Sequence, residues 1–260
     1  MPDGRPRNPR ELKQEFEVGT IHLAEEEACA LLQSAEIAKG YRTPWGSNYT
    51  FFVWIDDGSG KYLRAIYKPR DGERPLHDFP SGSLYKRELA TFILSRGLGW
   101  PNVPLTLIRE GPYGVGSVQL YIECDAEITY FDMIHKHSEE LLKFAVFDMI
   151  INNADRKATH CLLDKEGHLW SIDHGLTFHH IFKLRTIMLE FWGKTIPEVL
   201  LSDMEALQVT LESSNELVDK MAELITAPEM ASLLSRLETM RRNPVLPTLD
   251  PYYNVPWPWV

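Results

Sequence analysis

The chain has 260 residues, of which 44% are hydrophobic and 25% charged, and its formal net charge is −10. This length can bury a full core as one large domain or two lobes, and the acidic balance argues against nucleic acid or anionic lipid as main partners, since both attract clustered Lys and Arg. The absence of a long apolar run, of a secretory signal and of a CxxC pair predicts a cytoplasmic protein without stable membrane association or disulfides.

The N-terminal half begins with a Pro- and Arg-rich stretch, residues 1–12, which we expect to be a flexible tail. The segment EEEACALLQSAEI carries acidic residues at its start and predicts a short helix. Residues 41–69 then alternate β-forming runs with the turn sequences PWGSN and DDGSG. This alternation predicts three antiparallel strands.

A helix and two more strands complete this half. LYKRELATFILSRGL has helical character and is followed by glycine, which predicts a helix that ends there. PLTLIRE and GVGSVQLYIE, joined by GPYG, predict the two strands. The first half is therefore expected to be a small antiparallel sheet with one helix inserted after its third strand.

The second half changes to helical patterns. SEELLKFAVFDMIIN predicts a helix buried on one face, and HCLL with LWSID predicts a two-stranded ribbon. Further helices are expected in IFKLRTIMLEFWG, TIPEVLLSDMEALQVTLESS and ELVDKMAELITAPEMASLLSRLETMRR. The final stretch is rich in Pro and aromatic residues. We expect its rings to pack back on the domain, with extended binding to a partner protein as the alternative.

These elements predict an α+β fold with two lobes. The expected divisions are the N-terminal tail over residues 1–12, a β-rich N-lobe over 13–123, an α-rich C-lobe over 124–242 and the Pro/aromatic tail over 243–260. The two lobes would be linked near residues 121–125.

Two carboxylates flank the predicted ribbon. Asp155 precedes it in NNADR, and Asp173 follows it in WSIDHG. A hairpin brings its two ends together, so both carboxylates are expected in one place, where they suit a metal site or an acid/base pair. The alternative is that Asp155 caps one turn and Asp173 begins another.

Upstream, a lysine and a glutamate form a second candidate pair. Lys68 closes the strand RAIYK, and Glu88 lies on the following helix. A strand lysine facing a helix glutamate makes a fixed cation that can bind phosphate oxygens. The alternative is a solvated strand end and a solvated helix face.

The order of these features resembles the protein-kinase-like superfamily: a glycine turn, a strand lysine, a helix glutamate, a link between lobes, DRxxxH and DHG. NADRKATH and IDHGLTFH resemble a bacterial phosphatidylinositol 3/4-kinase-like group, as do YKPRDGERPLHDFP and the KLRT of FKLRT. The resemblance covers roughly residues 40–195. It implies a bilobal protein-kinase-like fold that binds ATP with Mg or Mn.

The resemblance also implies roles for the nucleotide-binding residues. Lys68 would contact the α- and β-phosphates, with Glu88 orienting it through an ion pair. A phosphate-covering turn would be formed by Gly46, Ser47 and Asn48, although this loop departs from the protein-kinase GxGxxG. The adenine would pair with the backbone of Tyr121, Ile122 and Glu123.

On the catalytic side, the resemblance makes Asp155 the acceptor of the proton from the attacking hydroxyl and Asp173 the metal-binding carboxylate. Arg156 is expected to hold the loop or a nearby carboxylate. His160 stands where most kinases have asparagine, and imidazole is a poor ligand for Mg²⁺ but a better one for Mn²⁺. Three interpretations of His160 are open. It ligates the metal beside Asp173, it hydrogen-bonds Asp155 or Asp173, or its presence indicates weakened metal binding.

The function expected from the resemblance is phosphoryl transfer from ATP to a hydroxyl of a protein or small molecule. A lipid acceptor is disfavoured because the chain lacks a polybasic segment. The alternatives are nucleotidyl transfer on the same fold and a nucleotide-binding pseudokinase. The pseudokinase would act through its aromatic tail on a protein partner.

Overall fold

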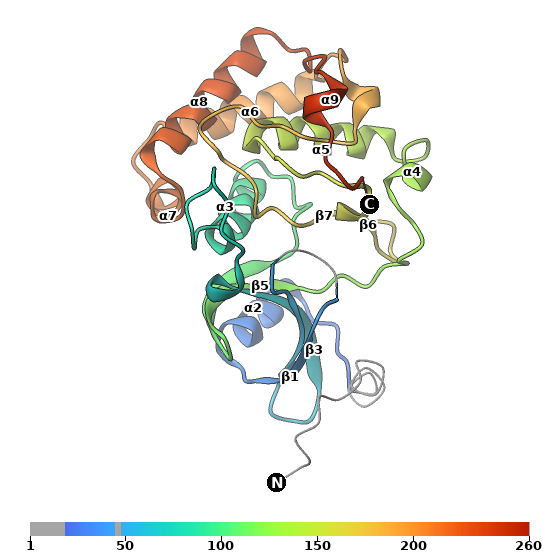
Figure 1. Cartoon of the computed structure of the whole chain (residues 1–260), viewed down its shortest axis with the longest axis vertical. Coiled ribbons are helices and arrows are strands. Elements are labelled where there is room, and N and C mark those ends of the chain that lie inside the picture. Colours follow the sequence, from blue (N-terminus) through green and yellow to red (C-terminus); the bar gives the residue numbers. More distant parts are fainter. Residues whose placement is uncertain (1–18, 45–47, 260) are drawn as a thin grey trace. The chain divides into compact units, whose positions relative to one another are not determined.

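The computed structural model describes residues 19–44 and 48–259 (Figure 1). Backbone contacts divide the chain into two compact units. Unit 1 comprises Met1–Leu76 and Leu105–Tyr121, and unit 2 comprises His77–Pro104 and Ile122–Val260. The predicted flexible tail, residues 1–12, lies outside the described residues, and the lobe bounds given above stay predictions.

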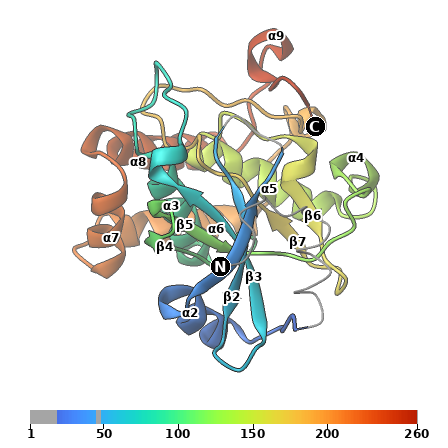
Figure 2. The same cartoon turned by 60° about the horizontal axis from the view of Figure 1, so that its bottom comes forward.

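Unit 1 contains a five-stranded antiparallel sheet with the order β1-β2-β3-β5-β4, which confirms the predicted strands. Figure 2 labels four of these strands, β2, β3, β4 and β5. The strands are β1 (Ile37–Arg42), β2 (Phe51–Asp56), β3 (Tyr62–Pro69), β4 (Thr106–Gly111) and β5 (Gly114–Leu120). Residues 77–104, between β3 and β4, belong to unit 2. The chain then returns to the sheet, where β5 pairs with both β3 and β4.

The turn between β2 and β3 is built around Asp57. Its Oδ1 accepts hydrogen bonds from the backbone N–H groups of Ser59 and Lys61, at 2.8 and 3.1 Å. Gly58 and Gly60 have φ angles of 84° and 82°, a region that side chains rarely tolerate. The DDGSG sequence therefore forms the predicted turn and sets the pairing of β2 with β3.

Helix α2 (Glu25–Ser34) packs on this sheet through Ala28 and Leu32, which are fully buried. Its first turn is acidic, which suits the positive end of the helix dipole. At the other end, the Arg109 guanidinium of β4 donates to the carbonyls of Leu32 and Ala35, both at 2.8 Å. The predicted helix is confirmed, and the sheet satisfies two of its last carbonyl groups.

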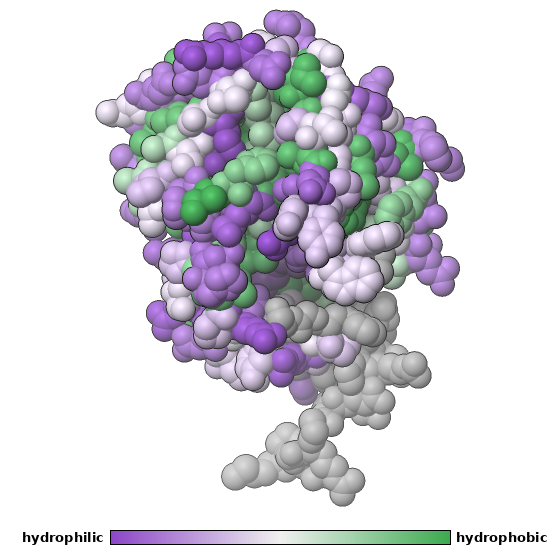
Figure 3. All heavy atoms as spheres, turned by 45° about the horizontal axis from the view of Figure 1, so that its top comes forward, coloured by the Kyte–Doolittle hydropathy of each residue, from purple (hydrophilic) through white to green (hydrophobic). Residues whose placement is uncertain are grey.

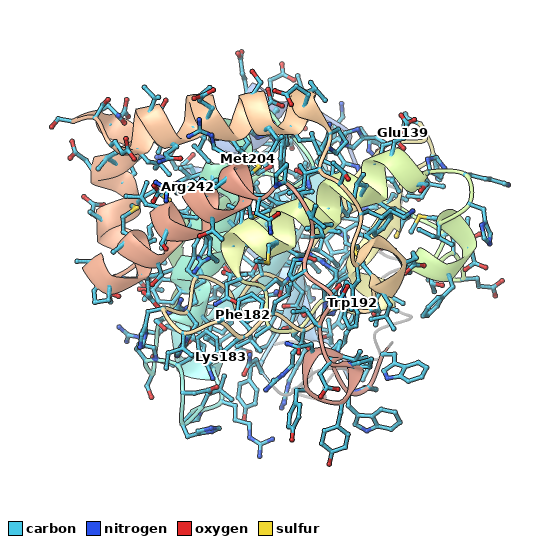
Figure 4. The ribbon with its side chains drawn as sticks, turned by 90° about the horizontal axis from the view of Figure 1, so that it is seen from above. Glu139, Phe182, Lys183, Trp192, Met204 and Arg242 are labelled. Atoms are coloured by element: carbon cyan, nitrogen blue, oxygen red, sulfur yellow. The ribbon has the colours of Figure 1, made fainter. Side chains whose placement is uncertain are left out.

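Unit 2 is mainly helical. Its longer helices are α3 (Leu84–Gly97), α5 (Ser138–Ile151), α6 (Glu198–Leu211), α7 (Glu216–Leu224) and α8 (Ala227–Arg242), and its short ones are α4 (Tyr130–Met133) and α9 (Pro251–Asn254). Strands β6 (Cys161–Leu163) and β7 (Leu169–Ser171) form the predicted antiparallel ribbon. Seen from above, α8 lies between α5 and α6 and contacts both (Figure 4).

Helix α5 is buried more completely than its apolar spacing predicts. Leu141, Val146 and Ile150 are buried as expected, but so are Phe144 and Phe147 on other sides of the helix. These residues join one hydrophobic cluster with residues of α3, α6 and α8. Its central place in the core explains why burial is not confined to one face.

The helix predicted in IFKLRTIMLEFWG is wrong, because only a short 3₁₀ turn (Leu189–Phe191) forms there. The preceding backbone bonds to the loop after α5 instead. The N–H of Arg185 donates to the Asn153 carbonyl at 2.9 Å, and the N–H of Ile187 donates to the Arg156 carbonyl at 3.2 Å. These partners replace the intrahelical hydrogen bonds that the sequence pattern suggested.

The last predicted helix is divided in two. Helix α7 ends before Ile225, whose backbone is extended, and α8 starts with Thr226 as its N-cap. Thr226 and Glu229 form a capping box, and Pro228 lies in the first turn. Proline suits a first turn but not a helix interior, so a continuous helix across this point was not to be expected.

The C-terminal tail lies on unit 2 through its backbone. The carbonyl of Leu246 accepts a hydrogen bond from the N–H of Gly193, and its own N–H donates to the Lys194 carbonyl, both at 2.9 Å. The expectation that the aromatic rings pack back is wrong: Tyr252 and Trp257 are 85% and 84% exposed. Backbone hydrogen bonds and the buried Leu246 side chain hold this segment, while these two rings remain exposed.

Among the described residues, no helix is both long and apolar enough to cross a bilayer. Hydrophilic residues cover much of the surface turned to the viewer in Figure 3.

Candidate active site

The loop after α5 carries the first predicted catalytic residue, and Asn152 shapes its start. Asn152 ends α5 in a left-handed conformation with φ 54° and ψ 53°. Its buried amide nitrogen donates to the carbonyls of His179 and Ile181 at 2.8 and 2.7 Å, and its side-chain oxygen accepts the N–H of Lys183 at 2.8 Å. One side chain thus joins the end of α5 to residues 179–183, where Figure 4 labels Phe182 and Lys183.

Arg156 is the centre of the loop, and its side chain is fully buried. Nε and Nη2 bind the two carboxylate oxygens of Asp148 at 2.7 and 2.8 Å. Nη1 donates to the carbonyls of His160 and Ile172, both at 3.1 Å, and Nη2 donates to Ser171 Oγ at 2.7 Å. One guanidinium therefore connects α5, the loop and both ends of the ribbon, as the loop-holding role of Arg156 predicts.

Asp155 lies next to this buried centre, with its side chain 28% exposed. Its backbone N–H donates to Asn153 Oδ1 at 3.0 Å, and its Oδ2 lies 3.2 Å from Lys157 Nζ. Burial raises the pKa of the Asp155 carboxyl to about 6; the Lys157 ammonium opposes this rise, and the nearby charge of Asp173 adds to it. Such a group is ionised at neutral pH and still basic enough to accept a proton.

Asp173 is brought to the same place by the ribbon. The N–H of Ile172 donates to the His160 carbonyl at 3.0 Å, and His160 Nε2 lies 3.4 Å from Asp173 Oδ2. Asp173 adopts a left-handed φ of 62°, and its side chain is 49% exposed. The carboxylate can therefore meet a ligand from solvent while His160 contacts it from the protein side.

Glu88 belongs to unit 2 and is 3% exposed. Its Oε2 accepts the backbone N–H of His174 at 3.1 Å, so α3 contacts the turn that carries Asp173. The neighbouring Arg87 donates to the Thr177 carbonyl and to Glu229 Oε1 of α8, the latter at 2.6 Å. These bonds fix α3 within unit 2.

The residues predicted to bind the nucleotide are distributed over both units. Lys68 lies half-buried on β3 in unit 1, opposite Ser117 of β5. Asn48 Oδ1 accepts the N–H of Arg74 at 2.7 Å. The other two members of the predicted phosphate turn, Gly46 and Ser47, lie outside the described residues.

The predicted adenine-binding stretch spans the passage from unit 1 to unit 2, between Tyr121 and Ile122. The N–H of Tyr121 donates to the Arg64 carbonyl at 3.1 Å, within unit 1. Glu123 forms an ion pair with Lys165 at 3.0 Å, within unit 2.

Sequence reasoning missed three residues that hold this site: Asp148, Arg87 and Glu229. A signal for Asp148 was present, because a lone carboxylate inside the apolar run FAVFDMII requires a buried partner. Arg87 and Glu229 lie 142 residues apart in the chain. No local sequence pattern could therefore have predicted that these two side chains form an ion pair.

No family model matches the sequence. The chain is 33% identical over 264 residues to Protein Rv2133c of Mycobacterium tuberculosis (strain ATCC 25618 / H37Rv), a match that covers 88% of this chain and 94% of that protein. It is also 27% identical over 183 residues to phosphatidylinositol 4-kinase gamma 4 of Oryza sativa subsp. japonica, covering 56% of this chain and 32% of that one.

Two solved structures share the fold. Hydra Fam20 with sugar matches with a TM-score of 0.52 and 14% identity, over 88% of this chain and 91% of that one. The Golgi casein kinase with Mn/ADP bound matches with a TM-score of 0.50 and 14% identity, over 84% and 74%. The α+β protein-kinase-like fold is thereby confirmed, and by sequence the chain belongs to the family of Protein Rv2133c.

Proposed function

We propose that the chain is an ATP-dependent phosphotransferase that moves the γ-phosphoryl group to a hydroxyl of a protein or small molecule. The observation that carries the proposal is the buried Arg156 guanidinium, which bonds to the Ile172 carbonyl next to Asp173 and lies beside Asp155 in the loop. On a kinase-like fold, these positions suit a base and a metal-binding carboxylate.

In the proposed reaction, Asp155 accepts the proton of the attacking hydroxyl. The hydroxyl oxygen forms a bond to the γ-phosphorus, and the bond from that phosphorus to the β–γ bridging oxygen breaks, which releases ADP. The pKa of about 6 keeps Asp155 ionised at neutral pH, so that it is ready to accept the proton.

Asp173, with His160 beside it, is the proposed place for Mg²⁺ or Mn²⁺, which when bound would neutralise phosphate charge. In the part of the chain that the structure describes, no three His, Cys, Asp or Glu side chains gather closely enough to hold a metal ion. Its other ligands would therefore be nucleotide oxygens and water, an arrangement that Mg²⁺ commonly adopts.

The remaining residues are proposed to bind the nucleotide. Lys68 would contact the α- and β-phosphates and pair with Glu88. Gly46, Ser47 and Asn48 would cover the phosphates, and the backbone of residues 121–123 would pair with adenine. The order of these residues along the chain supports this assignment.

The acceptor is proposed to be a protein or small molecule in the cytoplasm. The partial likeness to a plant phosphatidylinositol 4-kinase supports the resemblance to the phosphatidylinositol 3/4-kinase-like group. A net charge of −10 argues against work at an anionic lipid surface.

The test uses ATP labelled on the γ-phosphate and, separately, on the α-phosphate, with host lysate as acceptor and Mg²⁺ compared with Mn²⁺. We expect label to be transferred from the γ-position only, and to be lost in Asp173→Ala. Asp219→Ala, an exposed aspartate on α7, is the matched control and should transfer label like the wild type.

Transfer from the α-position would instead mean nucleotidyl transfer. The absence of any transfer, together with no rise in Tm on adding ATP, would contradict catalysis and favour an interaction protein. A Tm that rises with ATP but without transfer would identify a nucleotide-binding pseudokinase.

A further inference from the structure

The C-terminal segment forms specific hydrogen bonds that the proposed chemistry does not use. The carbonyl of Asn254, at the end of α9, accepts the backbone N–H of Thr186 at 2.8 Å. The side-chain nitrogen of Asn254 donates to the Leu184 carbonyl at 2.7 Å. Asn254 therefore binds residues 184–186 on both sides of Arg185.

Residues 184–187 are in turn bonded to the loop that carries Asp155. The N–H of Arg156 donates to the Arg185 carbonyl at 3.0 Å, and the N–H of Ile187 donates to the Arg156 carbonyl at 3.2 Å. The two chain segments run parallel where Arg156 faces Thr186. Asn254 thus stabilises residues 184–186. These residues in turn bind the backbone of Arg156, which follows Asp155 in the chain.

The end of the tail contacts the same loop directly. The carbonyl of Trp259 accepts the N–H of Ala158 at 2.8 Å. Ala158 is fully buried and begins the 3₁₀ turn Ala158–His160, whose first N–H groups have no partner inside the turn. The tail supplies the acceptor that this buried N–H needs. Figure 1 shows the red C-terminal segment running from α9 toward the β6–β7 ribbon.

The aromatic rings of this segment contribute little apolar burial. Tyr252, Tyr253 and Trp257 are 85%, 67% and 84% exposed. The segment is attached by the buried Pro256 and by directional hydrogen bonds to two loop segments. Such hydrogen bonds fix positions more than they add hydrophobic stability.

We propose that residues 254–259 are a positioning element for the catalytic loop, with Asn254 as the key positioning residue. The catalytic part of this inference rests on the proposed function, in which Asp155 is the base. When the tail is docked, Arg156 and Ala158 are held on both sides of Lys157, and the Asp155 carboxylate keeps its place.

The experiment measures amide hydrogen exchange in the full-length chain and its variants. Asn254→Asp keeps the shape of the side chain but removes the donor to the Leu184 carbonyl. We expect the amides of Ala158 and Thr186 to exchange about tenfold faster in this variant. Asn254→Ala, which removes the amide without adding a charge, should act in the same direction. Tyr252→Ala removes an exposed ring of the same tail and should leave both amides unchanged.

Kinetics with ATP then distinguish positioning from general stability. We expect Asn254→Asp to lower kcat about tenfold with little change in the KM for ATP. A lower Tm with unchanged kcat would overturn the positioning role, and so would unchanged exchange in both Asn254 variants. If the wild type transfers no phosphoryl group, the proposed function fails, but the exchange experiment still decides whether the tail holds the loop.

Discussion

Arg156 and Asp148 form a buried, two-pronged ion pair: Nε–Oδ2 measures 2.7 Å and Nη2–Oδ1 measures 2.8 Å. The two side chains are 0% and 1% exposed. Removing one partner of such a pair leaves the other charge buried without compensation. We expect Asp148→Asn to lower the free energy of unfolding by about 3 to 5 kcal/mol, measured by urea denaturation.

Asp219→Asn is the matched control, because Asp219 is exposed on α7, and it should be close to the wild type. Arg156→Lys should not preserve stability either, since lysine lacks the planar fork that binds both carboxylate oxygens. An Asp148→Asn protein as stable as the control would show that the pair does not hold the loop.

The pH dependence of kcat/KM should depend on the contact between Asp155 and Lys157. Asp155 must be ionised to accept a proton, so kcat/KM should fall as pH decreases through about 6, the pKa of its carboxyl. Lys157→Gln removes an ammonium that lowers this pKa, so the acid limb should move to higher pH. Lys165→Gln is the control, because the side chain of Lys165 is 69% exposed. The acid limb of its pH profile should stay at the pH of the wild type. An unmoved limb in Lys157→Gln would exclude Asp155 as the titrating base.

Asp155 should also limit stability at neutral pH. Its folded pKa of about 6 lies above the ordinary value of about 3.9, so ionisation disfavours the folded state as pH rises through this window. Asp155→Asn should therefore be more stable than the wild type at pH 8, by up to about 3 kcal/mol, although inactive. The difference should disappear near pH 4. Thermal unfolding at both pH values checks this, and an equal difference at both would refute it.

The Arg87–Glu229 ion pair should matter far more than an exposed one. Their side chains are 2% and 4% exposed, whereas Lys220 and Glu216 on α7 are 56% and 82% exposed. We expect Glu229→Ala to lower the free energy of unfolding by about 3 kcal/mol or more, since it also removes the α8 capping box. Glu216→Ala should give no resolvable change. Similar effects from both substitutions, in chemical denaturation, would contradict the anchoring of α3 by Arg87.

The substitution His160→Asn tests whether His160 hydrogen-bonds Asp173 or ligates the metal. If His160 acts by hydrogen-bonding Asp173, asparagine preserves a polar partner, and the ratio of activity with Mn²⁺ to activity with Mg²⁺ should stay constant. This is the result we expect, given the 3.4 Å contact. A shift of that ratio toward Mg²⁺ would instead identify His160 as a metal ligand, because oxygen ligands suit Mg²⁺ better than imidazole does.

The sequence predicted elements with strong local signals. Alternation and glycine turns located the five strands, and DDGSG in particular specified a turn that Asp57 builds. The prediction failed where long-range contacts replace local ones. Residues 181–193 have helical spacing, yet Asn152 and Arg156 bind their backbone and keep it irregular.

The same distinction applies to the candidate site. The sequence could predict that Asp155, Asp173 and His160 lie close together, because the motif spacing and the ribbon between them are local. Asp148 has a local signal as well, because a lone carboxylate in an apolar helix requires a buried partner, here Arg156. The contact of Ala158 with the Trp259 carbonyl has no sequence signal, since any residue can provide a backbone carbonyl.

The Arg87–Glu229 contact has a consequence for the order of folding. During synthesis, α3 leaves the ribosome well before its partner helix α8, and strands β4 and β5 of unit 1 are made between them. All residues of unit 1 have been synthesised once residue 121 has been added. In unit 2, the ion pair of Arg87 can form only after Glu229 has been added. Domains tend to fold as they emerge, so the sheet can form first, before the Arg87–Glu229 ion pair exists. The helix that carries Glu88 is thus made early, but its contact with α8 can form only after Glu229 has been added.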